Sequence, residues 1–469
     1  MIPNVNQTIA DGGLGILPAT NDQTMAALGV CSLGVPNTIY AFGGTDPSAV
    51  TAALGTGPLV EFVAYCLTLG GGTIYAMPIS QGTASSSGAV TKVGTGTAVV
   101  SLSSGIGFDG YTGIIKIVTG AANLAALAAT YQLSLDGGLT YGPVTAYPLS
   151  GVIAIANTGL AISTVDGTFV AGDTYSWTTT APSYTTTNFN TAITALLADP
   201  RSWKFAYLVG QATSATNSAI MGAAFATKLA GAEASKRYCY GVMESAVDTD
   251  TNQITAFASF TSSRVGVAAG MMAITSPVTG RVVSRSGGWA MAARMKSTKP
   301  KTDPGQFDLG PIPGIVSLAR DEQATPGLDA QRFSTMRTIP TAPGYYITNV
   351  NMMAGAGSDY SLVTRRAVMD LACTISNLGN LKFLNKDIRV DAVTGFILEV
   401  DARNWESYVN TLLLTGLVGQ VSASRIILNR ANNILSSSTV YVKVRVTPLG
   451  YAKDIEVDIG YSNPSLSLV

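Results

Sequence analysis

The chain has 469 residues, enough for two or three domains with a sizeable core. Only 12% of the residues are charged, against a usual share of about 25%, and the 28 basic and 28 acidic residues balance. This balance excludes the strong net charge that favours nucleic acids or anionic membranes, and the absence of histidine excludes every Ser–His or Cys–His catalytic dyad. A weakly charged chain with 50 glycines instead indicates a surface that other protein covers.

The first 22 residues are predicted to be an N-terminal arm, because they are polar and rich in glycine around residues 11–15. They lack the basic region and the apolar core of a secretory signal, so we expect no secretion. The longest apolar stretches, residues 265–274 and 412–418, are too short to span a bilayer, so we also expect no membrane insertion.

A core domain is predicted to begin at residue 23, with its first part extending over residues 23–82. An apolar run over residues 26–35 predicts a buried strand. Pro58, at the favoured first helical position, begins a helix that extends to residue 67, and residues 73–78 predict a second strand. The order strand, helix, strand indicates a parallel pair.

Residues 83–185 have a different composition, with almost no helix signal and much Gly, Ser, Thr and Val. Turn signatures occur at residues 135–138 and 165–168, and alternating patterns occur at residues 131–135 and 175–180. We interpret this region as a separate small β-sandwich or β-barrel inserted into the core.

The second part of the core is predicted over residues 186–437, where helical and strand patterns alternate. Predicted helices cover residues 191–198, 215–230, 256–272, 359–378 and 404–414, with Asn404 as the N-cap of the last. Predicted strands cover residues 204–209, 238–243, 314–318, 344–350, 396–400 and 425–428. The predicted fold is therefore an α/β or α+β core with an inserted all-β domain and extended N- and C-terminal β-strand arms.

The C-terminal arm, residues 438–469, carries the clearest strand pattern of the chain. Two alternating runs, residues 440–447 and 453–459, flank a Pro-Leu-Gly turn and predict a hairpin. One face of each run is apolar, and the other is basic in the first run and acidic in the second. The residues are Val440, Val442, Val444 and Val446 with Lys443 and Arg445, then Ile455, Val457 and Ile459 with Asp454, Glu456 and Asp458.

An isolated hairpin is marginal in water, so this one must dock either on its own domain or on another chain by strand addition. The polar segment at residues 432–439 predicts a flexible linker, which favours docking on another chain. The sequence therefore predicts an assembly protein whose terminal strand arm joins subunits.

No motif predicts a catalytic, cofactor or metal site. Residues 105–110 match G-x-G-x-x-G, but a strand pattern follows where a dinucleotide site needs a helix, so a β-turn is the better interpretation. Residues 248–252 resemble the start of a calcium loop but lack the required Gly and the final Glu. The four cysteines are far apart without a C-x-x-C pair, which predicts neither a zinc site nor a disulfide framework.

A basic segment, residues 281–301, contains no acidic residue and only one aromatic residue, Trp289. Two interpretations stay open: a solvated basic face, or a charged surface that contacts an acidic partner. The cations of this segment are Arg281, Arg285, Arg294, Lys296, Lys299 and Lys301.

Several stretches resemble the tail sheath proteins of contractile phages and related injection machines. The most specific block runs over residues 333–370 and includes residues 333–338, 343–349 and 365–370. Residues 57–61, 169–175 and 178–182 resemble the same lineage, so that the likeness covers most of the chain. Residues 341–342 and 350–351 depart mildly from the pattern and carry no site.

The resemblance implies a structural polymer. Many copies would stack around an inner tube, the inserted domain would project outward, and the terminal arms would add strands to the sheets of neighbours. On triggering, the sheath would shorten and drive the tube through a target envelope. We then expect the basic segment to be a candidate inner-tube contact, and residues 12–22 and 432–439 to act as hinges.

The expected partners are further copies of the chain, a tail tube protein, and baseplate and tail terminator proteins, with no direct contact to nucleic acid. The expected location is the tail of a virion assembled in a bacterial cytoplasm. Two alternatives remain from the sequence: another self-assembling protein, such as a tube, capsid or surface-layer subunit, or a His-free α/β enzyme with an accessory β domain.

Overall fold

The structure is a computed structural model that describes residues 24–461, except residues 104–106, 127, 211, 356 and 432. The predicted N-terminal arm at residues 1–22 lies outside the described residues. The chain divides into two compact units, Met1–Asn377 and Leu378–Val469.

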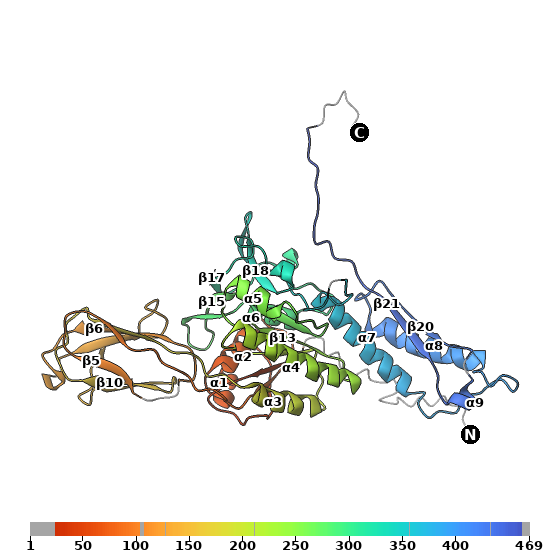
Figure 1. The fold of residues 1–469 in the computed structure, drawn as a ribbon, viewed down its shortest axis with the longest axis horizontal. Helices are drawn as coiled ribbons and strands as arrows, with labels where there is room; N and C mark the ends of the chain where they lie inside the picture. The colour runs from red at the N-terminus through yellow and green to blue at the C-terminus, as the bar shows by residue number, and fades with distance from the viewer. Residues whose placement is uncertain are drawn as a thin grey trace, which may run out of the picture. The chain divides into compact units, whose positions relative to one another are not determined.

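The first unit contains a six-stranded sheet with the order β14-β13-β12-β1-β3-β2 (Figure 1). All neighbouring pairs are parallel except β2 and β3, which are antiparallel at one edge. The inner strands are continuous apolar runs because helices cover both faces of a parallel sheet. The strands are β1 (Met25–Gly29), β2 (Tyr40–Phe42), β3 (Ile74–Pro78), β12 (Phe205–Leu208), β13 (Tyr240–Glu244) and β14 (Val265–Ala268).

Two apolar clusters fill the two faces of this sheet. Along β12, Tyr207 belongs to one cluster and Leu208 to the other, as the two-residue period of a strand requires. Helices α2 and α6 contribute to the first cluster, where Phe62 stacks on Tyr207 at 4.5 Å between ring centroids, and helices α3, α4 and α5 contribute to the second. The helices are α1 (Ser48–Leu54), α2 (Pro58–Thr68), α3 (Thr186–Ala198), α4 (Ala215–Ala234), α5 (Asp250–Phe257) and α6 (Gly288–Ser297).

The parallel pair predicted around the helix that begins at Pro58 is confirmed, since β1 and β3 pair in parallel and α2 lies between them in the chain. The predicted helix over residues 256–272 is wrong. This stretch contains the end of α5, then β14 and the start of β15. The reason is tertiary: residues 265–268 pair in parallel with β13. Gly266 also packs closely in this strand, since an added Cβ would lie 2.7 Å from the Asn351 carbonyl oxygen.

Smaller antiparallel elements complete the α/β core. β15 (Met271–Thr275) lies between β16 (Val282–Ser286) and β17 (Ile315–Leu318), and β18 (Thr335–Ile339) pairs with β19 (Ala342–Asn349). Short 3-10 helices cover Leu124–Ala126, Phe307–Leu309 and Asp329–Gln331.

Helix α7 (Val363–Leu381) begins in the first unit, where buried charges anchor it. Asp370 accepts hydrogen bonds from Arg366 and from Arg264, the latter at 3.2 Å, and the three side chains are at most 6% exposed. Both Arg366 and Asp370 belong to the stretch 365–370 that resembles sheath proteins, so this block serves packing.

Residues between β3 and α3 form a β-sandwich with an apolar core of its own, here named the insert (Figure 1). Two sheets, β5-β10-β9 and β4-β11-β6-β7-β8, enclose this core, which contains Ile115, Ile162 and Trp177. The strands are β4 (Thr91–Val93), β5 (Val99–Ser103), β6 (Thr112–Thr119), β7 (Thr130–Ser134), β8 (Thr145–Ala146), β9 (Val152–Ile155), β10 (Leu160–Val165) and β11 (Thr174–Thr178).

The second unit contains α8 (Glu399–Gly416), β20 (Ala423–Leu428), α9 (Ile434–Ser437) and β21 (Val442–Thr447). The strand predicted at residues 396–400 and the N-cap predicted at Asn404 are wrong, because α8 begins at Glu399. Acidic side chains in its first turn, Glu399 and Asp401, interact favourably with the helix dipole. The core of this unit includes Trp405, on which Phe383 stacks at 4.4 Å between ring centroids.

Candidate assembly interface

The predicted C-terminal hairpin is wrong within the chain. β21 pairs antiparallel with β20, and residues 448–461 form no strand. The reason is that β20 presents an apolar face, with Ile426 and Leu428 at most 5% exposed, next to which the valines of β21 continue the same face. The first run of the predicted arm therefore completes the sheet of its own unit.

The second run, residues 453–459, extends away from β21 as an open segment (Figure 1). Ile455, Val457 and Ile459 are 79%, 68% and 87% exposed. Burying one such side chain stabilises a protein by about 1.5–3 kcal/mol, so leaving three of them in water is unfavourable. We name residues 448–461 the C-terminal extension.

The exposed face of the sheet of the second unit is basic, whereas the C-terminal extension carries alternating acidic residues. On the exposed face of this sheet Arg425 lies directly opposite Arg445, with Lys443 on the same face. Like charges in opposite positions destabilise a strand pair, and none of the three has an acidic partner among the described residues. Acidic residues alternate along the extension instead: Asp454, Glu456 and Asp458.

The predicted flexible linker at residues 432–439 contains a short helix, α9, so this prediction is wrong for the residues that α9 covers. The Asn433 side chain caps the helix by accepting a hydrogen bond from the Ser436 amide. An Asn that offers a cap to the following backbone favours a helical turn over an open linker, a signal present in the sequence.

The basic segment is not one solvated face. Lys296 is completely buried and donates a hydrogen bond to the Gly70 carbonyl oxygen, and Arg285 is 11% exposed and paired with Asp109. Arg294 is half-buried and donates to the carbonyl oxygens of Gly310 and Pro311 at 3.2 Å. The prediction of a contact surface is therefore wrong for Arg285 and Lys296.

The physical reason is that β16 and α6 divide this segment, and α6 packs against the sheet. Arg285, Arg294 and Lys296 consequently point into the protein. Lys299 remains exposed, whereas Arg281 and Lys301 are partly buried.

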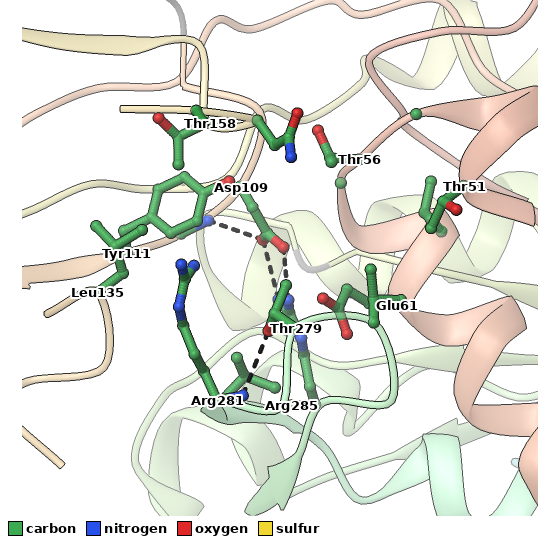
Figure 2. Close-up of a pocket in the computed structure, with 18 of the residues that line it drawn as sticks. Thr51, Thr56, Glu61, Asp109, Tyr111, Leu135, Thr158, Thr279, Arg281 and Arg285 are labelled. Carbon is green, nitrogen blue, oxygen red and sulfur yellow. Dashed lines mark hydrogen bonds and ion pairs between the residues drawn. The ribbon is translucent and has the colours of Figure 1, made fainter. Parts of the chain in front are cut away.

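A cavity of about 440 Å³ with a mixed polar and apolar lining lies where the base of the insert meets the core (Figure 2). The insert contributes Asp109 and Tyr111, helix α2 contributes Glu61, and the loop and strand after β15 contribute Arg281 and Arg285. Arg285 donates two parallel hydrogen bonds to the Asp109 carboxylate, at 3.0 and 2.5 Å. This bidentate ion pair fixes the insert to the core.

Buried carboxyl groups near this ion pair have raised pKa values. Burial raises the pKa of Glu61, which accepts hydrogen bonds from the Ser276 hydroxyl at 2.7 and 2.9 Å. Burial likewise raises the pKa of Glu244, at the end of β13, to about 7, against the lowering effect of the hydrogen bond from Trp289 Nε1 at 2.6 Å. Trp289 in turn carries the Arg285 guanidinium over its ring, 5.1 Å from the centroid.

Sequence reasoning missed Asp109, because an Asp before Gly indicated a solvated turn. Its partner Arg285 is 176 residues away in the chain, so no local pattern signals the pair.

The described residues contain no group of three or more Cys, Asp or Glu side chains placed to hold a metal ion. Asp248, in the stretch that resembles a calcium loop, instead accepts hydrogen bonds from the Thr249 amide and the Asn252 side chain at the start of α5. No helix of the described chain has the length and apolar character needed to cross a bilayer.

A family model, "DUF2586, N-terminal domain", matches residues 2–351 of the sequence. No curated protein matches the sequence.

Solved structures with a similar fold are subunits of contractile machines. The sheath complex of an extracellular contractile injection system, PVC, in the contracted state has a TM-score of 0.52 and 9% identity, over 98% of this chain and 97% of that chain. A chain of the contracted anti-feeding prophage baseplate has a TM-score of 0.51 and 10% identity, over 98% of each chain. A sheath tail protein of Desulfitobacterium hafniense has a TM-score of 0.48 and 12% identity, over 96% of this chain and all of that chain.

Proposed function

From the premise that the chain belongs to the DUF2586 family and has the fold of contractile sheath proteins, we propose that it is a structural subunit of a contractile sheath and not an enzyme. The observation that carries the proposal is the likeness to a sheath subunit over 98% of the chain. Copies of the chain polymerise around an inner tube, and contraction of the polymer drives the tube through a target envelope. Its partners are the tube, baseplate and terminator proteins of a phage tail or a related injection particle.

The subunits are joined by strand exchange. The C-terminal extension of one copy adds to the free edge of β21 in another copy, which removes Ile455, Val457 and Ile459 from water. Its alternation matches the acceptor, since the apolar residues continue the valine face of β21 while the acidic residues lie beside Lys443 and Arg445. Opposite charges on neighbouring strands stabilise the pairing and fix its register.

Main-chain hydrogen bonds of an added strand persist while the attached subunits rotate. Contraction is then a rearrangement of rigid bodies between two packings of the same chain. A head-to-tail contact whose rotation does not close generates a helical assembly, which is the geometry that this proposal requires. The exposed Lys299 is the residue of the basic segment that remains suited to contact an acidic tube surface.

Deletion of residues 448–469 tests the arm while leaving β21 in place. We expect a folded monomer that forms no cylinders in negative-stain micrographs under conditions where the full chain forms them. Cylinders of the truncated chain would refute the role of the extension.

A charge exchange provides the matched control. Reversal of the extension (Asp454→Lys, Glu456→Lys, Asp458→Lys) or of the sheet (Arg425→Glu, Lys443→Glu, Arg445→Glu) should each impair assembly, and both together in one chain should restore it. If the combined variant assembles no better than either half, the acidic and basic faces do not pair.

A further inference from the structure

The cavity at the base of the insert contains an arginine without an acidic partner. Arg281 is partly buried, and its guanidinium points into the cavity toward Tyr111 (Figure 2). This guanidinium forms no hydrogen bond or ion pair with any residue that the structure describes. The backbone of Arg281 is fixed in a tight turn, because its carbonyl oxygen accepts a hydrogen bond from the Ser276 amide at 2.8 Å. The turn therefore holds an unpaired cation in place.

The two carboxyl groups of the cavity are already engaged. Asp109 accepts hydrogen bonds from both terminal nitrogens of Arg285. Glu61 accepts the hydroxyl of Ser276, and burial raises the pKa of Glu61, which favours its neutral form. Because the charges of Arg285 and Asp109 cancel, the cavity retains the single positive charge of Arg281.

Further hydrogen-bond donors surround this charge. Nε of Arg285 is buried and donates to no described residue. Burial raises the pKa of Tyr111, so its phenol keeps its proton and can donate. Tyr111 lines the same cavity as the two arginines. Buried donors in native structures have acceptors, so this group of donors indicates a ligand rich in acceptor oxygens.

We propose that the cavity binds a small oxyanion with one negative charge, a carboxylate or a phosphate, with Arg281 as its main contact. A guanidinium matches two oxygens of either group through two parallel hydrogen bonds. Charge selects a monoanion, because a second negative charge would lie near Asp109 without a cation to balance it. The volume of about 440 Å³ is in the range of small-molecule sites.

The bound anion would join the insert to the core. Arg281 belongs to the turn between β15 and β16, whereas Tyr111 belongs to the insert, so an anion in contact with both adds a bridge beside the Asp109–Arg285 pair. The site is complete only while the insert is docked on the core. The anion therefore stabilises the docked insert by mass action.

Binding of acetate and of inorganic phosphate to the purified full chain tests the site. At fixed pH and ionic strength, with chloride as the reference anion, the melting temperature should rise with the concentration of at least one of the two. Arg281→Gln should weaken this affinity about tenfold or more, because it removes a charge-assisted pair of hydrogen bonds. The control Lys236→Gln removes an exposed cation outside the cavity and should keep the wild-type affinity.

The stability of Arg281→Gln without added acetate or phosphate separates binding from a structural role. The variant should then unfold at the wild-type temperature, because Arg281 has no partner to lose. A strongly destabilised variant would overturn the inference, and so would equal responses of the variant and the wild type to the anions.

Hydrogen exchange of the wild-type chain gives a measurement that needs no variant. The anion should slow exchange at residues 109–111 and 276–285 and leave the second unit unchanged. A response to acetate alone identifies a carboxylate ligand, and a response to phosphate alone identifies a phosphate. If neither anion binds and Arg281→Gln impairs only polymerisation, the acceptor belongs to another copy of the chain and the small-anion site is overturned.

Discussion

The insert and the second unit, Leu378–Val469, both expose apolar β-structure, but they differ in charge. The second unit is called the C-terminal unit below. The described outward side chains of the β5-β10-β9 sheet of the insert are uncharged, whereas the sheet and the extension of the C-terminal unit alternate apolar residues with cations or anions. An uncharged face tolerates any apolar neighbour, so its specificity must come from geometry. A charged face rejects like charges, so it specifies both its partner and its register.

The two regions also differ in the ion pairs that stabilise them. The insert relies on a single apolar core and on the Asp109–Arg285 pair at its base. The C-terminal unit has a small core and several exposed ion pairs, among them Arg403 with Glu399. Buried pairs are costly to break, and exposed pairs contribute little.

The largest expected effect is at the base of the insert. Asp109→Ala leaves Arg285 as an uncompensated buried charge, so we expect a loss of about 3–5 kcal/mol in the free energy of unfolding, measured by urea denaturation. Replacing both partners with apolar residues, Asp109→Leu with Arg285→Met, should recover most of this loss. A double variant as unstable as the single one would show that the pair is not the fixing contact.

Ile162→Ala tests the apolar core of the insert. The side chain is completely buried between the two sheets, so its truncation should cost about 2–5 kcal/mol. Hydrogen exchange should show the loss in strands of the insert, with protection in the C-terminal unit unchanged. Equal losses in both regions would mean that the insert does not unfold as a unit of its own.

Glu244→Gln tests a pH dependence in the α/β core, at the end of β13, that the C-terminal unit should lack. The pKa of Glu244 is raised from 4.5 to about 7 because the carboxyl is buried, so the stability it confers when protonated is lost as pH rises from about 4.5 through 7. The variant should therefore gain stability relative to wild type at pH 8, on the order of 2 kcal/mol, and show no gain at pH 4.5.

The C-terminal unit supplies the control. Hydrogen bonds from Arg430 and Arg403 lower the pKa of Glu399 from 4.5 to about 2, so the stability from this carboxylate is fully present above about pH 4.5 and is lost as pH falls from there through about 2. Glu399→Gln should consequently change the free energy of unfolding by the same small amount at pH 5 and pH 8. A gain in the free energy of unfolding of Glu399→Gln at pH 8, similar to that expected for Glu244→Gln, would contradict this prediction.

The smallest expected effect concerns an exposed pair. Arg403 and Glu399 are 74% and 51% exposed, so Arg403→Ala should change the free energy of unfolding by at most about 0.5 kcal/mol, measured by thermal denaturation. A loss above about 2 kcal/mol would place this ion pair in the same class as Asp109–Arg285.

Local patterns predicted much of the secondary structure. The Pro58 helix, the strand at residues 73–78 and the alternation at residues 131–135 correspond to α2, β3 and β7. Side-chain period and helix signals act over a few residues, so the chain carries them wherever it folds. The helix predicted at residues 256–272 is wrong because residues 265–268 pair with β13, a contact that local helix preference does not encode.

The local pattern shows where apolar residues and charges alternate, and so which runs can become strands. Their partners depend on the folded chain: β20 pairs with β21, residues 453–459 form no strand, and Arg285 of the basic segment forms an ion pair with Asp109. The physical reason is distance along the chain. Strand pairing and burial of charge depend on contacts between residues far apart in sequence, which no local pattern encodes.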